Sequence, residues 1–192
     1  SPALFCGVNT LFDALLNSAD FRKLDFSTLK LCIQGGTALR SATAERWKQC
    51  TGNGVVEMYG LSETSGGITV NHWNQDNPVG SIGITMSDSE FSIRDAEGNE
   101  VKTGEAGELC FRGLQVTTGY WKREDSRDQC FFPGNWFRTG DVAKADEHGY
   151  LFLLDRLKDM ILVSGFNVYP NEIEDVVAML EGVLEVAAIG VP

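Results

Sequence analysis

Two short apolar runs with a helix-type segment between them constrain the fold of this chain more than any other feature. Residues 29–33 have the pattern of a buried strand that the glycine pair 35–36 stops, and residues 55–59 have the pattern of a second strand. Between them, residues 41–50 have the pattern of a helix that Ser41 can cap. Strand, helix and strand at this spacing predict a right-handed crossover, and therefore a parallel sheet in an α/β fold.

Both predicted helices of this first part carry local signals for their ends. Asn9 and Thr10 can cap a helix upstream of the first strand, and Gly52 can end the helix of residues 41–50. The upstream helix has apolar residues at helical spacing, which predict one buried face made of Leu11, Phe12, Leu15 and Leu16.

From about residue 80 the pattern changes to short strands and tight turns. Residues 90–94, 107–112 and 150–154 have the pattern of strands, and turns with glycine precede or follow them. Several short strands joined by such turns predict an antiparallel β subdomain.

The last part of the chain predicts the beginning of a small α+β domain. Residues 160–163 and 186–189 have the pattern of strands, and Pro170 can open a helix between them that Gly182 stops. The apolar positions of this helix repeat at helical spacing: Ile173, Val176, Val177 and Leu180.

The charge balance and the cysteines limit the partners and the compartment. The 192 residues include 16 Lys and Arg against 27 Asp and Glu, a net charge of −11. We therefore expect no nucleic-acid partner. No apolar run reaches the ~20 residues of a membrane span. The five cysteines lack Cys-x-x-Cys spacing, and His72 and His148 lack metal-ligand spacing, so we expect reduced thiols and a cytoplasmic protein.

Three segments could carry chemistry, and each has an ordinary structural alternative. Residues 59–67 lead from a strand into a turn rich in glycine and hydroxyl groups, which could bind a phosphate, with Glu63 holding a divalent cation, or could be a simple strand-to-loop turn. Asp141 follows a glycine turn and could bind both hydroxyls of a ribose or only cap that turn. The charged residues 155–159 could form a hinge or an interstrand turn. Walker-type, dinucleotide-binding and hydrolase signatures are absent from the sequence.

Further motifs join these segments in a fixed order. They are residues 35–39 (GGTAL), 59–63 (YGLSE), 107–113 (GELCFRG), 119–121 (GYW), 137–141 (FRTGD) and the block 155–174. Together they resemble the motifs of the adenylate-forming superfamily of acyl-CoA synthetases, adenylation domains and luciferases. Within the superfamily, the block 155–174 looks most like long-chain fatty acid–CoA ligases.

The resemblance implies a domain organisation and a two-step reaction. Residues 1–79 would form the second part of a large α/β adenylation domain with a parallel sheet, residues 80–157 its antiparallel β subdomain, and residues 158–192 the start of a mobile C-terminal domain. A long-chain fatty acid would react with ATP to give acyl-AMP, and coenzyme A would then take the acyl group. Magnesium ion is the implied metal. Peripheral attachment to a membrane and a homodimer of the parent enzyme are compatible with the resemblance.

The resemblance also implies a role for individual residues. Tyr59 would lie against adenine, Ser62 would contact the α-phosphate in place of the family's usual threonine, and Glu63 would bind Mg²⁺. Asp141 and Arg156 would hold the ribose. The remaining implied roles belong to Gly36, Thr37 and Ala38, which would line the adenine and acyl pocket, to Lys158 as the hinge of the C-terminal domain, and to Gly165 on the face presented for thioester formation.

Two functional parts of the superfamily have no match in this sequence. The phosphate loop rich in serine, threonine and glycine is expected upstream of the chain, and the catalytic lysine is expected downstream of Pro192. We therefore expect the chain to be part of a longer enzyme and to be inactive alone. Two other functions stay open: an adenylation enzyme that passes its acyl group to a carrier protein, and a nucleotide-binding or interaction module without catalysis.

Overall fold

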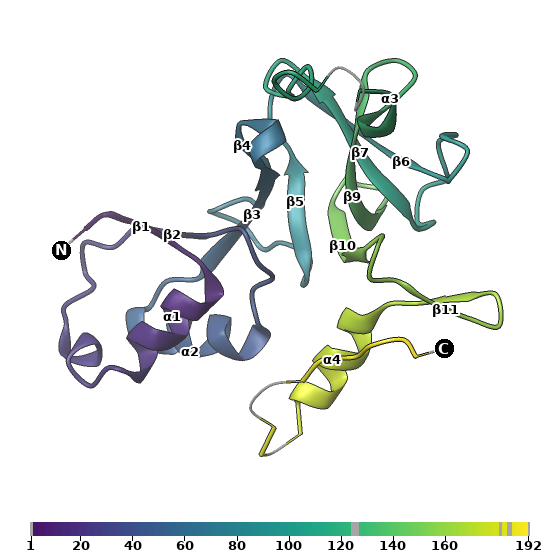
Figure 1. Ribbon diagram of the computed structural model, residues 1–192. Helices are drawn as coiled ribbons and strands as arrows, with labels where there is room; N and C mark the ends of the chain where they lie inside the picture. The colour runs from purple at the N-terminus through teal and green to yellow at the C-terminus, as the bar shows by residue number, and fades with distance from the viewer. Residues whose placement is uncertain (1, 124–126, 181, 184–185, 192) are drawn as a thin grey trace. The chain divides into compact units, whose positions relative to one another are not determined.

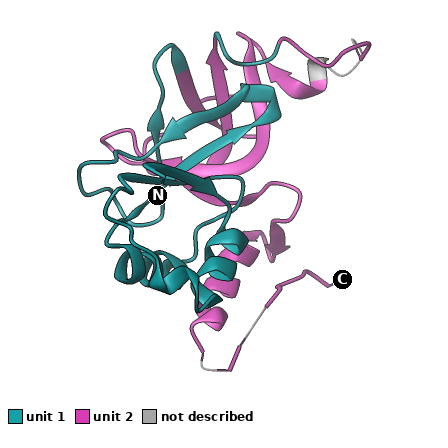
Figure 2. Ribbon diagram, turned by 90° about the vertical axis from the view of Figure 1, so that its left-hand side faces the viewer, with its two compact units in different colours: residues 1–89, 114–117 teal, residues 90–113, 118–192 magenta. Residues whose placement is uncertain are grey.

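The computed structural model describes residues 2–123, 127–180, 182–183 and 186–191. The chain divides into two compact units, which Figure 2 distinguishes by colour. Unit 1 contains residues 1–89 and 114–117, and unit 2 contains residues 90–113 and 118–192. The fold is mixed α/β, as predicted, with parallel strands in unit 1 and antiparallel strands in both units.

Unit 1 contains a sheet with the strand order β1-β2-β3-β4-β5. The first three strands are parallel, and the last two are antiparallel additions. Helix α2 lies between β2 and β3 in the sequence, so the predicted strand–helix–strand unit with parallel strands is confirmed. Strands β1, β4 and β5 were not predicted. The strands are β1 (Leu4–Gly7), β2 (Leu31–Gln34), β3 (Val55–Leu61), β4 (Gly66–Val70) and β5 (Ser81–Thr85).

Four helical segments complete unit 1, and its two longer helices lie side by side (Figure 1). The predicted apolar face of the first helix is confirmed at Phe12 and Leu16, which are buried, whereas Leu11 is 41% exposed. The helical segments are α1 (Asn9–Asn17), η1 (Phe21–Lys23), α2 (Ser41–Thr51) and η2 (Ser62–Thr64).

Both predicted helix caps at the N-termini are wrong. The residues that precede the helices are Val8 and Arg40, and neither makes a side-chain capping hydrogen bond. The reason at α1 is that the Asn9 side chain is engaged in longer-range contacts, because its Oδ1 accepts a hydrogen bond from Arg40 N at 3.0 Å. Ser41 already lies inside α2 as its first residue. Gly52 ends α2 with φ +76°, as predicted.

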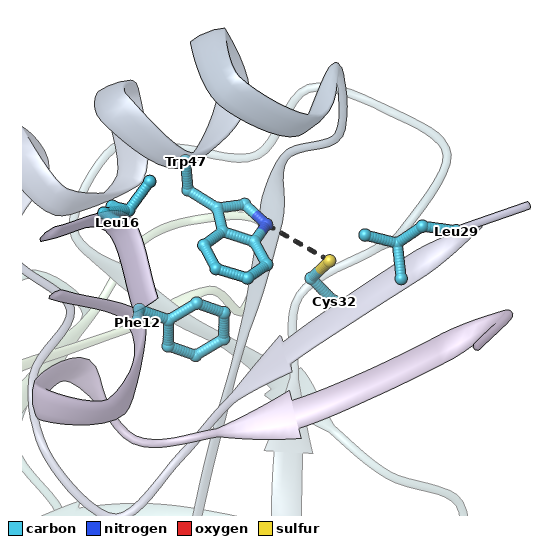
Figure 3. Close-up of a cluster of buried hydrophobic side chains, with 5 residues drawn as sticks. All are labelled: Phe12, Leu16, Leu29, Cys32 and Trp47. Carbon is cyan, nitrogen blue, oxygen red and sulfur yellow. Dashed lines mark hydrogen bonds between the residues drawn. The ribbon is translucent and has the colours of Figure 1, made fainter. Parts of the chain in front are cut away.

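The core of unit 1 is built around Trp47 of α2. Its indole Nε1 donates to Cys32 Sγ of β2 at 3.2 Å, and its ring lies edge-on against Phe12 of α1 with centroids 4.5 Å apart. Figure 3 shows these side chains with Leu16 and Leu29, which complete the cluster. The helices are therefore fixed on the parallel strands by aromatic packing.

Unit 2 contains an antiparallel sheet with the strand order β10-β9-β7-β6, and β8 pairs with β9. The predicted antiparallel subdomain is confirmed. The glycine turn predicted before Asp141 is wrong, because β9 continues through Gly140, whose φ of +73° accompanies a bulge in the pairing with β7. The elements are β6 (Ser89–Arg94), β7 (Gly107–Gly113), α3 (Arg127–Cys130), β8 (Phe131–Phe132), β9 (Trp136–Ala145) and β10 (Leu151–Arg156).

The rest of unit 2 is a two-stranded hairpin followed by a helix. Strands β11 (Ile161–Val163) and β12 (Phe166–Val168) pair antiparallel, and helix α4 spans Pro170–Ala178. The predicted strand and the start of the helix at Pro170 are confirmed, but the predicted stop at Gly182 is wrong, because α4 ends at Ala178. The predicted strand at 186–189 is wrong, because these residues make no sheet pairing in the structure, and Ala188 N donates instead to Glu174 Oε1 at 2.9 Å.

Candidate functional site

The turn that follows β3 is held by a buried threonine. Thr64 is fully buried, and its Oγ1 accepts a hydrogen bond from Leu61 N at 2.8 Å. The same hydroxyl lies 2.7 Å from Gly66 O, to which it can donate. Ser62 is exposed and Glu63 is half-buried on this turn. The sequence analysis missed Thr64; its signal is a hydroxyl residue three positions after the end of a strand, the spacing of a capping interaction.

Residues 114–117 form hydrogen bonds with the same turn. Thr117 N donates to Glu63 O at 2.7 Å, and Ser65 Oγ donates to Gln115 O at 2.8 Å. The amide of Gln115 donates in turn to Gly67 O at 3.0 Å. The backbone around the predicted phosphate-contacting residues is therefore fixed on both sides.

Two predicted site residues of unit 1, Gly36 and Ser62, line one open pocket of about 650 Å³. Half of the residues that line it are glycines, and the others include Ile33, Met58 and Leu61. A Cβ on Gly60 would overlap the backbone of Gly66, so β3 and β4 can approach this closely only because residue 60 is glycine. Glycine backbone and apolar side chains therefore share the wall of this pocket.

The other predicted site residues of unit 1 do not line this pocket. Thr37 and Ala38 lie exposed in the loop between β2 and α2. Tyr59 is half-buried on β3, in register with Thr69 of β4. The structure therefore brings Gly36 and Ser62 together but places Tyr59 and Glu63 beside this pocket rather than in its wall.

The two predicted ribose-binding residues lie together in unit 2. Arg156 of β10 is opposite Asp141 of β9 in the strand register, and Arg156 Nε lies 3.0 Å from Asp141 Oδ1. The carboxylate is buried, with a side-chain exposure of 3%, whereas the guanidinium side chain is 56% exposed. Leu157 N donates to Gly140 O at 2.8 Å and extends the pairing of the two strands beyond the ion pair. A buried carboxylate beside an exposed cation is a suitable acceptor for hydroxyl groups.

The segment after β10 contains the predicted hinge residue. Lys158 is exposed in a turn in which Met160 N donates to Arg156 O at 3.1 Å. Asp155, which the sequence analysis included in this charged segment without a role of its own, is 4% exposed. It accepts hydrogen bonds from Arg156 N at 2.7 Å, at the start of the turn, and from Asn171 N at 3.0 Å, in the first turn of α4.

Gly165 lies away from this segment, at the turn of the β11–β12 hairpin. Its φ is +86°, and a Cβ at this position would meet no atom within 4 Å. The turn therefore requires glycine for its backbone conformation and not for space.

The part of the chain that the structure describes has no ready-made metal centre. These residues contain no cluster of three His, Cys, Asp or Glu side chains that could hold a metal ion. A magnesium ion at Glu63 would therefore take most of its oxygen ligands from phosphates and water, which is the usual way in which proteins bind Mg²⁺. None of the described helices has the length and apolar character needed to cross a membrane.

Curated relatives of the chain include long-chain-fatty-acid–CoA ligases. The long-chain-fatty-acid–CoA ligase of Salmonella typhimurium is 53% identical to this chain over 186 residues, which is 97% of the chain and 33% of the relative. The chain therefore spans about a third of the length of the curated relatives that it matches.

Solved structures with the same fold include CoA synthetases. The ATP-bound structure of MatB from Rhodopseudomonas palustris has a TM-score of 0.90 and 35% identity, and the match covers 99% of this chain and 38% of that one. The O-succinylbenzoate CoA synthetase MenE from Bacillus subtilis, in complex with ATP and magnesium ion, has a TM-score of 0.86 and 27% identity, covering 98% of this chain and 39% of that one. The model of the AMP-binding enzyme family matches residues 1–121, and the chain belongs to this family.

Proposed function

We propose that this chain is part of an enzyme that converts a long-chain fatty acid to its CoA thioester, with ATP as the energy source. The 53% identity to a long-chain-fatty-acid–CoA ligase over 97% of the chain carries the proposal of substrate class. The buried Asp141 carboxylate paired with Arg156 supports nucleotide binding, because such a carboxylate can accept hydrogen bonds from a ribose diol.

The proposed reaction has two steps. A carboxylate oxygen of the fatty acid attacks the α-phosphorus of ATP, and the bond to pyrophosphate breaks. The sulfur of coenzyme A then attacks the carbonyl carbon of the acyl-adenylate, loses its proton and expels AMP. Both steps develop charge on oxygen atoms, so the enzyme acts mainly by orienting the reactants and stabilising that charge.

Each predicted residue keeps the part of the reaction that the resemblance assigns to it. Ser62, which is exposed, would donate to the α-phosphate, and Glu63 would hold Mg²⁺, which neutralises charge on the phosphate oxygens when bound. Tyr59 would lie against adenine. The other assignments are the adenine and acyl pocket at Gly36, Thr37 and Ala38, the ribose at Asp141 and Arg156, the domain hinge at Lys158, and the thioester-forming face at Gly165.

The organisation of the parent enzyme is part of the proposal. We place the large adenylation domain at residues 1–79, its β subdomain at 80–157 and the start of the mobile domain at 158–192. All five cysteines are free, which supports a cytoplasmic, reducing environment. Because the chain spans only a third of its relatives, we expect the 192 residues alone to make no acyl-adenylate.

The test is a substrate panel on the full-length parent. Fatty-acid-dependent exchange of pyrophosphate into ATP should be fastest with long-chain acids and absent from the 192-residue chain. The thioester product should contain coenzyme A. A preference for aryl or amino acids would contradict the substrate class, and a thioester on a carrier protein would contradict the acceptor. ATP binding without any exchange would identify a binding module instead.

A further inference from the structure

The loop between β2 and α2 is held by polar side chains from three different elements. Its residues 35–40 lie outside any helix or strand. Gln34, at the end of β2, donates from Nε2 to the Thr37 backbone oxygen and also lies 3.3 Å from Thr37 Oγ1. Glu57 Oε1 of β3 accepts a hydrogen bond from Leu39 N at 3.2 Å. Asn9 Oδ1 of α1 accepts a hydrogen bond from Arg40 N, as described above.

These side chains reach the loop because of the strand register. Gln34 and Glu57 are register partners on the parallel strands β2 and β3. Register partners in a parallel pair point to the same face of the sheet, so both side chains are directed to the loop that leaves the end of β2. Gln34 is 1% exposed and Asn9 is 5% exposed.

Polar groups at such buried positions are costly unless they are hydrogen-bonded. Burial raises the pKa of the Glu57 carboxyl, whereas the hydrogen bond from Leu39 N acts in the opposite direction. An apolar residue would fill each position without this cost. The three side chains instead provide hydrogen-bond partners for backbone groups of the loop, which fix its conformation.

The fixed loop carries the exposed residues Gly36, Thr37 and Ala38, and Gly36 lines the open pocket with Ser62. We propose that Gln34, Glu57 and Asn9 are positioning residues that hold loop 35–40 in the conformation that binds the adenosine part of ATP. This inference rests on the proposed function, which assigns these three loop residues to the adenine pocket. The positioning residues contact the loop and not the nucleotide.

The test compares two near-isosteric variants and one conservative variant in the full-length parent. Gln34→Met and Glu57→Met each remove hydrogen bonds to the loop, and we expect about tenfold weaker ATP binding, the order expected for a lost buried hydrogen bond that orders a binding loop. Binding of inorganic tripolyphosphate, which has no base or ribose, should not change. Glu57→Gln keeps an acceptor oxygen and should restore ATP affinity to within about twofold of wild type.

Thr51→Val is the matched control. It removes a buried side-chain hydrogen bond to Trp47 O at the C-terminal end of α2, the end opposite to loop 35–40, and should lower the thermal midpoint without changing ATP affinity. Hydrogen exchange of the wild type adds a measurement that needs no variant: the amides of Leu39 and Arg40 should be protected.

Three results would overturn the inference. They are wild-type ATP affinity in both methionine variants, an equal loss of tripolyphosphate affinity, and rapid exchange at both loop amides. If one methionine variant does not fold, the ATP affinity of the other variant, which lies on a different strand, tests the inference. A wild-type parent that binds no ATP would overturn the proposed function itself, and the positioning role with it.

Discussion

Removing the Asp141 carboxylate should weaken ATP binding, because the ribose diol of ATP loses a hydrogen-bond acceptor. Because the carboxylate is almost fully buried, water screens its hydrogen bonds little. The carboxylate also contacts Arg156, with Oδ1 3.0 Å from Nε, and we take one charge-assisted hydrogen bond to the ribose as the basis of the magnitude. Such a bond is worth about 1.5–3 kcal/mol, which corresponds to roughly 10- to 150-fold weaker binding of ATP to Asp141→Ala.

The assay is calorimetric titration of the full-length parent with ATP and with 2′,3′-dideoxy-ATP. The wild type should prefer ATP by the factor given above, because only ATP carries the diol. In Asp141→Ala this preference should fall by about that factor, and any remainder would come from Arg156, the other residue proposed to hold the ribose. The variant leaves the Arg156 guanidinium in place, and its 56% exposure means that water can solvate it.

Asp146→Ala is the control for this experiment. Asp146 Oδ1 also accepts two backbone hydrogen bonds in unit 2, from His148 N and Tyr150 N, both at 2.9 Å. Its removal should affect stability but leave the preference for ATP over the dideoxy analogue intact. If Asp141→Ala keeps that preference, the ribose role of Asp141 is refuted, whatever the change in total affinity.

Two further predictions concern packing and thiol reactivity. Gly60→Ala should destabilise the parent by about 1–3 kcal/mol, because the new Cβ would overlap the Gly66 backbone. The control is Gly54→Ala, where a Cβ meets no atom within 4 Å and the thermal midpoint should stay nearly unchanged. Equal midpoints for the two variants would contradict the close approach of β3 and β4. Burial raises the pKa of Cys110 to about 12 and also raises the pKa of Cys32. At pH 8 both thiols should therefore resist iodoacetamide in the native parent and react after denaturation in urea. Rapid labelling of Cys110 in the native parent would contradict its burial.

The parallel part of the fold could be predicted because its information is local. Apolar runs at 29–33 and 55–59, and the helix pattern between them, are readable within short windows, and the spacing selects a crossover. Strand β4 was missed because it begins with two glycines, which are typical of turns. Its pairing depends on how closely the β3 backbone approaches, which no local pattern records.

The Asp141–Arg156 pair shows where reasoning from the residues alone stops. The two residues are 15 positions apart on neighbouring strands, and their pairing depends on a register shift between Leu153 and Asp155 of β10. Because a shift of one residue turns every following side chain to the other face, the alternation of β10 alone could not place Arg156 beside Asp141. Only the family resemblance predicted that they act together.

Motifs in the sequence predicted the candidate site residues, but they did not predict the buried polar residues that fix the backbone around that site. Thr64 is fully buried behind Ser62 and Glu63, Gln34 is buried behind loop 35–40, and Asp155 is buried beside Arg156. Each forms a hydrogen bond with a backbone group at the end of a strand or in a loop: Leu61 N, Thr37 O and Arg156 N. Since a buried polar group costs free energy unless it is paired, such a residue is tolerated where it fixes a required backbone path. Substitutions at these positions should therefore impair nucleotide binding without any contact with the nucleotide, as the proposed Gln34→Met experiment tests directly.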